Sequence, residues 1–321
     1  MAIVIFHYGV NIFPFNNEYV NFLFKQANIG VSYFFVLSGF IMIIAYGNYD
    51  KVNPAEYLKA RFARIYPLLA LSVGLFIVAA FLHGGVNLTD ILLNLSTIQA
   101  WIPGKATVGN FPLWSLTVEI FFYVCFPFFF NYFYKKYSIG VSIIMIVLVW
   151  ITSIAAQHYL LHSSFYTDYS NSHSFIYYFP VMHLNQFLAG NLAGLLFIHK
   201  TPVTGKRYDI LVILAIIGFV LLLKYPFGVD YHNGFLAVVF IPLILFQAKN
   251  RGMLTMLFSK KPFVFLGEIS FGIYMLQIPV FMIMQSILLK LNIIEPIVVF
   301  YTSLTVLIVV SAICHIYFEL P

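Results

Sequence analysis

Charged residues are scarce in this sequence: they make up 9% of the 321 residues, whereas hydrophobic residues make up 62%. A soluble globular domain carries about 25% charged residues, so this composition excludes a domain that covers itself in water. Cysteine is also scarce, because only Cys125 and Cys314 occur, and both lie in apolar runs. That placement argues against a disulfide framework. The sequence also has no glycine-rich phosphate loop and no short-period repeat.

What the sequence has instead is a series of long apolar runs separated by short polar breaks. Such runs predict an all-α fold, a polytopic helical bundle in a membrane, in a single domain over residues 1–321. We expect about ten transmembrane helices, over residues 1–15, 29–46, 66–83, 112–134, 138–158, 175–198, 208–224, 234–248, 263–289 and 294–318. In the sixth of them Gly190 and Gly194 form a GxxxG pair, which is typical of close helix packing.

The first expected span is short. From Met1 to Phe15 a helix would rise only about 22 Å, against a hydrocarbon core of about 30 Å. We therefore expect the missing turns to lie upstream of Met1. The sequence also stops abruptly at FELP (318–321), just past the last expected span. The domain is accordingly predicted to lack a few residues at each end.

Lysine and arginine are distributed unevenly among the connections between these spans. Of the 17 residues, 13 lie in the second, fourth, sixth and eighth connections. The positive-inside rule then places the even-numbered connections and both termini in the cytoplasm. Membrane topology therefore explains the net charge of +6, and we expect no nucleic-acid partner.

One carboxylate lies deep inside an expected span. Glu119 occurs within FPLWSLTVEIFFYVCFPFF (111–129), and a carboxylate at that depth costs at least about 2.5 kcal/mol. At helical spacing Ser115, Glu119 and Tyr123 fall on one side, which gives an apolar helix a polar seam. Intramembrane acids are often functional. The alternative is a structural carboxylate that a neighbouring helix holds.

The first span carries a histidine, His7, with Asn11 one turn further on the same helical face. Histidine is the side chain best suited to accept and return a proton near neutral pH. The alternative is a buried imidazole bonded to a neighbouring backbone or carboxylate group. If the two residues are neighbours, the imidazole of His7 would act as a base and the carboxylate of Glu119 would orient it. Sequence spacing does not show that the two meet.

Two arginines stand three residues apart in the second connection, where NPAEYLKARFARIYP leads into the third span. Arg61 and Arg64 therefore face the same way on a helix, and two guanidinium forks at a membrane surface suit a phosphate or pyrophosphate ligand. The alternative is ordinary flanking charge of the positive-inside kind.

The other histidines give weaker signals. His158 and His162 stand at metal-ligand spacing, with His173 at the far end of the same connection, but they lack an evident carboxylate or cysteine companion. We therefore expect a surface cluster and no metal site. His183 lies with Gln186 on a polar stripe of the sixth span, where it lines a cavity or serves packing.

Taken in order, the motifs resemble those of the acyltransferase-3 type of integral-membrane acyltransferases, which modify bacterial surface polysaccharides and related acceptors. AIVIFHYG carries His7, RFARIYP carries Arg61 and Arg64, and WSLTVEIFFY carries Glu119. GVSYFFVLSGFIM (30–42), FLGEISFGIYMLQIPV (265–280) and the closing FELP also fit. The resemblance covers essentially the whole chain.

The resemblance implies that acyl-coenzyme A, here acetyl-coenzyme A, binds from the cytoplasm with Arg61 and Arg64 near its phosphates. It implies that His7 is the central catalytic residue and that the position of Glu119 is functional. From the polar seam we add that Ser115 and Tyr123 lend hydrogen bonds to a developing oxyanion. The expected supporting residues are Asn11, Ser115, Tyr123 and Gln277.

Two positions depart from the family's pattern. The family usually has an arginine shortly before the first-span histidine, and here Met1 arrives before that position. The family also offers a histidine where YMLQIP (274–279) has Gln277. Glutamine keeps its hydrogen-bonding ability but does not titrate.

We therefore expect an enzyme of the bacterial inner (plasma) membrane that transfers an acetyl group from cytoplasmic acetyl-coenzyme A to a carbohydrate hydroxyl. The acceptor is a polysaccharide or a lipid-linked sugar, and membrane lipid surrounds the protein. Two other interpretations use the same residues. One is a transporter or flippase for a lipid-linked sugar, with His7 and Glu119 as a proton relay. The other is a family member that has lost its catalytic activity and serves as an assembly partner for polymer export.

Overall fold

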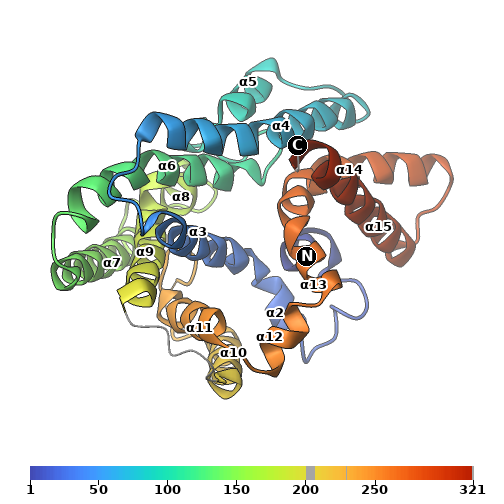
Figure 1. Cartoon of the computed structure of the whole chain (residues 1–321). Coiled ribbons are helices and arrows are strands. Elements are labelled where there is room, and N and C mark those ends of the chain that lie inside the picture. Colours follow the sequence, from blue (N-terminus) through green and yellow to red (C-terminus); the bar gives the residue numbers. More distant parts are fainter. Residues whose placement is uncertain (200–206, 229, 320–321) are drawn as a thin grey trace. The chain divides into compact units, whose positions relative to one another are not determined.

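The structure of the chain, a computed structural model, describes residues 1–199, 207–228 and 230–319 (Figure 1). These residues form helices and connections and contain no β-strand, which confirms the all-α prediction for them. Lys200 and Lys206, counted above in the sixth connection, lie outside the described residues, as do Leu320 and Pro321 of the closing motif. The chain divides into two compact units, which are described in turn.

Unit 1 consists of Met1–Asn28, Lys59–Thr117 and Lys261–Pro321. Its helices are α1 (Ala2–Val4), the π-helix η1 (Ile5–Gly9), α2 (Asn21–Lys25), most of α4 (Pro54–Phe81), α5 (Leu88–Ser96), the 3-10 helix η3 (Gln99–Trp101), the start of α6 (Leu113–Phe129), α13 (Lys261–Glu268), α14 (Ser270–Lys290), α15 (Pro296–Cys314) and the π-helix η6 (His315–Glu319). Helices α14 and α15 lie side by side (Figure 1), and they approach closely where Gly272 faces Ser311.

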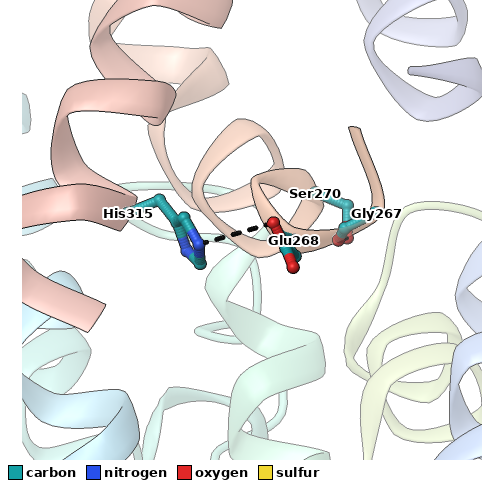
Figure 2. A network of polar contacts seen from close by, with 4 residues as sticks. All are labelled: Gly267, Glu268, Ser270 and His315. Atoms are coloured by element: carbon teal, nitrogen blue, oxygen red, sulfur yellow. Dashed lines mark hydrogen bonds and ion pairs between the residues drawn. The ribbon is translucent and has the colours of Figure 1, made fainter. Parts of the chain in front are cut away.

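One polar contact of unit 1 joins its C-terminal helices. Figure 2 shows His315, the first residue of η6, next to Glu268, the last residue of α13, with 3.9 Å between Nε2 and Oε2. The Ser270 hydroxyl donates to the carbonyl of Gly267 at 2.6 Å in the turn that separates α13 from α14. The first contact joins η6 to α13, and the second lies in the turn between α13 and α14.

Unit 2 consists of Ile29–Leu58 and Val118–Lys260. Its helices are α3 (Gly30–Tyr46), the rest of α6, the π-helix η4 (Phe130–Tyr134), α7 (Ile139–Leu161), α8 (Asn171–Tyr178), the 3-10 helix η5 (Pro180–His183), α9 (Leu184–His199), α10 (Asp209–Lys224), α11 (Ala237–Lys249) and α12 (Met253–Phe258); the 3-10 helix η2 (Ala27–Ile29) precedes α3. Asp209 caps α12, because its carboxylate accepts from the backbone N–H groups of Met253 at 2.9 Å and Leu254 at 3.1 Å.

Helices α3 and α9 pack against each other through glycines, which confirms the packing role predicted for Gly190 and Gly194. A Cβ atom added at Gly190 would overlap the carbonyl oxygen of Val36, and one added at Gly39 would overlap that of Phe187. The buried Asn191 side chain then donates across the interface to the Gly39 carbonyl at 3.0 Å. The two backbones therefore come as close as the absence of side chains allows.

Seven helical segments of the described residues are long and apolar enough to cross a membrane. They are Ala27–Tyr46, Pro54–Phe81, Leu113–Tyr134, Ile139–Leu161, Asn171–His199, Ser270–Lys290 and Pro296–Tyr317, and each overlaps one expected span. The prediction of a polytopic helical membrane protein is thus confirmed in its coarse form. The count of about ten is not confirmed.

The three remaining expected spans correspond to shorter helices. In place of span 1–15 the helix ends at Gly9, while α10 has 16 residues and α11 has 13. At 1.5 Å per residue, α10 rises about 24 Å, less than a hydrocarbon core of about 30 Å. Helix α5 was not predicted, because it lies in a connection. Asn87 begins it, since its side chain accepts from the Thr89 N–H at 2.9 Å.

Candidate functional site in unit 1

His7 lies in the middle of η1, a single π-helical turn of the kind that often marks a functional site. Its ring is half-buried and meets the ring of Phe111 edge to face, with centroids 5.3 Å apart at 84°. The Phe6 ring lies on another side at 5.1 Å. Among the described residues, no hydrogen bond satisfies either ring nitrogen of His7. An imidazole held by aromatic edges, with both nitrogens available, can accept and return a proton.

The C-terminal helices of unit 1 hold η1 in place. Tyr8 stacks on Phe281 of α14, with ring centroids 4.0 Å apart at 15°. Gly9 lies against Phe300 of α15, and a Cβ atom added there would lie 2.8 Å from that ring. Two helices distant in sequence thus fix the residues that follow His7. Stacking and close packing of this kind orient the imidazole without a hydrogen bond to it.

An asparagine that sequence reasoning missed positions Phe111. The side chain of Asn94, in α5, accepts from the backbone N–H of Asn110 at 2.8 Å, and a Cβ atom added at Gly109 would overlap it. Asn110 in turn donates to the Met275 carbonyl of α14 at 2.9 Å. The segment before α6 is therefore clamped from two sides, and the Phe111 ring is held against His7.

Buried amide groups of unit 1 have unused hydrogen-bonding capacity. Gln277 is fully buried; its Nε2 donates to the Tyr274 carbonyl at 2.9 Å, while its Oε1 has no hydrogen-bond partner among the described residues. Within the same described residues, Asn110 Oδ1 and both amide atoms of the buried Gln99 also lack one. Such groups suit a polar ligand or water. Gln99 was missed because it lies in a connection.

Helix α6 carries the predicted polar seam, with Ser115, Glu119 and Tyr123 at intervals of four residues. Two of these side chains contact each other: Tyr123 donates its hydroxyl to a carboxylate oxygen of Glu119. The Ser115 hydroxyl lies 2.7 Å from the Tyr274 hydroxyl and donates to the Pro112 carbonyl at 3.0 Å. Both hydroxyls expected to serve an oxyanion therefore have protein partners in this structure.

The remaining predicted residues are placed as follows. His7 belongs to unit 1 and Glu119 to unit 2, so their pairing stays a prediction. Asn11 lies beyond the end of η1, which means that the helical face it was expected to share with His7 is not formed. On α4, Arg61 is half-buried and Arg64 is exposed to solvent.

The structure decides between the two interpretations of His183. The side chain is fully buried, and its Nε2 lies 3.0 Å from the Tyr177 carbonyl, while Gln186 Nε2 lies 3.0 Å from its Nδ1. His183 therefore has the role of a packed, hydrogen-bonded histidine. The rings of His158 and His162 lie 4.2 Å apart and are tilted by 42°, and no group of three metal-ligating side chains occurs in the described part of the chain.

Comparisons with known proteins identify relatives of limited identity. Acyltransferase MdmB of Streptomyces mycarofaciens is 37% identical over 108 residues, which are 31% of this chain and 27% of the relative. O-acetyltransferase OatA of Staphylococcus aureus is 21% identical over 344 aligned residues, 98% of this chain and 55% of the relative. Nodulation protein 10 of Rhizobium leguminosarum bv. viciae is 26% identical over 166 residues, 46% of this chain and 44% of the relative.

The chain thus spans about half, or less, of the length of these relatives. No solved structure matches it. The acyltransferase domain of the acyltransferase-3 type matches residues 1–316, which is nearly the whole chain and includes every motif quoted above apart from the closing FELP. The chain therefore belongs to the acyltransferase-3 family of membrane acyltransferases.

Proposed function

We propose that the protein transfers an acetyl group from acetyl-coenzyme A to a hydroxyl of a carbohydrate that is exported or exposed at the cell surface. Family membership supports an acyltransferase, and one relative is named an O-acetyltransferase. The observation that carries the proposal is the state of His7. Its half-buried ring lies between aromatic side chains, with no hydrogen bond to its nitrogens from the described residues.

In the proposed reaction His7 removes the proton from the acceptor hydroxyl. The hydroxyl oxygen attacks the thioester carbonyl, a C–O bond forms and the C–S bond breaks. The imidazolium then returns its proton to the sulfur, so the products are an acetyl ester and coenzyme A. A variant of this scheme has His7 carry the acetyl group transiently before the hydroxyl attacks. The role of Glu119, stabilising a positively charged imidazole, is proposed from the sequence.

The donor is proposed to bind from the cytoplasm. Arg64 is exposed and Arg61 half-buried on one helix, and paired guanidinium groups suit the phosphates of coenzyme A. The distribution of lysine and arginine supports a ten-span topology with both termini in the cytoplasm, in the inner membrane of a bacterium. The acceptor, a polysaccharide or a lipid-linked sugar, then meets the acetyl group within the membrane protein.

The direct test of this function is whether the protein transfers a labelled acetyl group from coenzyme A to a carbohydrate. Purified protein in detergent is incubated with acetyl-labelled coenzyme A and with polysaccharide fragments from a strain that lacks the gene, which present unmodified hydroxyls. We expect labelled acetyl ester on the carbohydrate, detected by mass spectrometry, together with one thiol released for each ester. A transporter or an assembly partner would leave the label on coenzyme A, and that result would exclude the proposed reaction.

Replacement of both arginines is expected to weaken donor binding. A charge-assisted hydrogen bond contributes about 1.5–3 kcal/mol, so Arg61→Gln with Arg64→Gln should raise the KM for acetyl-coenzyme A at least about tenfold. Steady-state thiol release measures this. Lys59→Gln is the matched control, because Lys59 is exposed on the same helix two residues before Arg61.

Acetyl-dephospho-coenzyme A, which lacks the 3′-phosphate, separates phosphate recognition from a loss of helix structure. The wild type should prefer the full donor, and the double variant should bind both donors alike. A double variant that keeps the preference of the wild type would show that the arginines are ordinary flanking charge.

A further inference from the structure

We propose that a row of stacked rings on unit 2 binds a pyranose unit of the carbohydrate acceptor. This ring row consists of Tyr169, His173 and Tyr177. The identity of the ligand rests on the proposed function, whereas the ring row itself is a feature of the structure. Its residues lie in or beside the fifth connection, which the charge distribution assigns to the outer side of the membrane.

The ring row runs from the surface into unit 2. Tyr169 is 97% exposed, while His173 and Tyr177 are half-buried. The ring of Tyr169 lies 5.9 Å from that of His173 at an interplanar angle of 22°, and the ring of His173 lies 4.4 Å from that of Tyr177 at 27°. The three rings are therefore stacked in nearly the same orientation, and the outermost one faces solvent.

Two buried histidines anchor the inner end of the ring row. The carbonyl oxygen of Tyr177 lies 3.0 Å from Nε2 of His183 and 3.0 Å from Nε2 of His232. A carbonyl only accepts hydrogen bonds, so both imidazoles donate from Nε2. Burial lowers the pKa of His232, which favours the neutral form of its ring. The backbone below the ring row is consequently fixed.

The outer end is held in a backbone conformation that tyrosine rarely adopts. Tyr169 has φ +56°, in the left-handed region, where a bulky residue persists only if its surroundings enforce it. Ser170 supplies that constraint: its hydroxyl donates to the Thr167 carbonyl at 2.6 Å and accepts from the backbone N–H of Ser172 at 3.1 Å. Packing does not explain the conformation, because the Tyr169 side chain is almost fully exposed.

Two carboxylates flank the ring row, and both interact electrostatically with His173. Asp168 is exposed and accepts from the Tyr166 hydroxyl at 2.6 Å. Burial and this hydrogen bond raise the pKa of Tyr166 to about 12, so the phenol keeps its proton. Asp230 accepts from the backbone N–H of His232 at 2.9 Å through Oδ1, and it also interacts with the side chain of Tyr177.

These features together match a sugar better than other ligands. A pyranose has an apolar C–H face that packs on an aromatic ring and a rim of hydroxyl donors that carboxylates accept. Two carboxylates disfavour an anionic ligand, and an apolar ligand would offer them no hydrogen-bond donor. Interfacial tyrosines that only contact lipid headgroups need neither a stacked row nor a constrained backbone.

Calorimetric titration tests binding independently of acetyl transfer. The probe is the set of fragments released by mild acid from the surface polysaccharide of a strain lacking the gene, titrated into detergent-purified full-length protein. We expect Tyr169→Ala to weaken binding about tenfold and Tyr169→Phe, which keeps the ring, to bind like the wild type. Asp168→Asn should weaken binding to a smaller extent. Tyr159→Ala removes a 72% exposed tyrosine outside the ring row and is the matched control.

The outcomes separate the ring row from the proposed function. In the label-transfer assay, Tyr169→Ala should raise the KM for the fragments about tenfold, an effect that Tyr159→Ala does not show. Equal affinity of Tyr169→Ala and wild type, or no binding by the wild type, would overturn the acceptor site. An equal loss of affinity in Tyr159→Ala would indicate that these tyrosines anchor the protein in the membrane. That result would also overturn the acceptor site. Fragments that bind through Tyr169 without becoming labelled would contradict the proposed function alone.

Discussion

His7→Ala is expected to lower the rate of acetyl transfer between about a hundredfold and ten-thousandfold, the range in which general acid–base groups act. The reason is that the other histidines of unit 1 have other surroundings: His83 is exposed just beyond α4, with its Nδ1 2.9 Å from the Ala79 carbonyl, and His315 lies next to Glu268. The KM for acetyl-coenzyme A should change little, because the phosphates are assigned to other residues. Single-turnover measurement of ester formation gives the rate directly.

His83→Ala is the matched control for this change, since it removes a histidine of the same unit from the surface. It should transfer acetyl groups at the rate of the wild type. His7→Gln, which keeps a hydrogen-bonding side chain that does not titrate, should be as slow as His7→Ala. A fast His7→Gln would mean that hydrogen bonding alone suffices and that no proton passes through residue 7.

The same measurements distinguish the two forms of the mechanism. If His7 carries the acetyl group, label should remain on the protein when no acceptor is present, and His7→Ala should abolish it. If His7 is only a base, the protein should stay unlabelled while the donor remains bound. The amount of label that remains on the quenched protein, after its separation from free coenzyme A, distinguishes the two forms of the mechanism.

The sequence predicted those parts of the fold that depend on local pattern. Of the ten spans that long apolar runs predicted, seven are helices able to cross a membrane in the part of the chain that the structure describes, and Gly190 with Gly194 identified a close helix contact. Local pattern failed where tertiary context sets helix length. An apolar run does not specify that the first helix stops at Gly9. Nor does an amphipathic helix such as α5 stand out in a connection between apolar runs.

For the candidate site, the sequence indicated residue types but not their partners. Glu119 stands out because a carboxylate in an apolar run is costly, and His7 because an imidazole accepts and returns a proton near neutral pH. The contacts that hold the surroundings of His7 join residues far apart in the chain, such as Asn110 with Met275. Helical periodicity relates residues a few positions apart, so it contains no information on such pairs. For that reason Asn94, which holds Asn110, was missed.

Gly190→Ala is expected to destabilise unit 2 by about 1–3 kcal/mol, the usual range for overpacking in a well-packed core. The added methyl group would overlap the carbonyl oxygen of Val36 and lie 2.9 Å from the Phe40 nitrogen. Both are backbone atoms, so no change of side-chain rotamer relieves the clash. Helices α3 and α9 must separate, and the hydrogen bond from Asn191 to the Gly39 carbonyl would lengthen.

Gly218→Ala is the matched control, because a Cβ atom added there meets nothing within 4 Å. In the middle of α10 it should stabilise the helix by up to about 1 kcal/mol, since alanine is the better helix former. The two substitutions add the same methyl group within one unit, yet their thermal unfolding midpoints in detergent should move in opposite directions. A Gly190→Ala midpoint equal to that of the wild type would mean that α3 and α9 tolerate separation, and close glycine packing would then not be what holds unit 2 together.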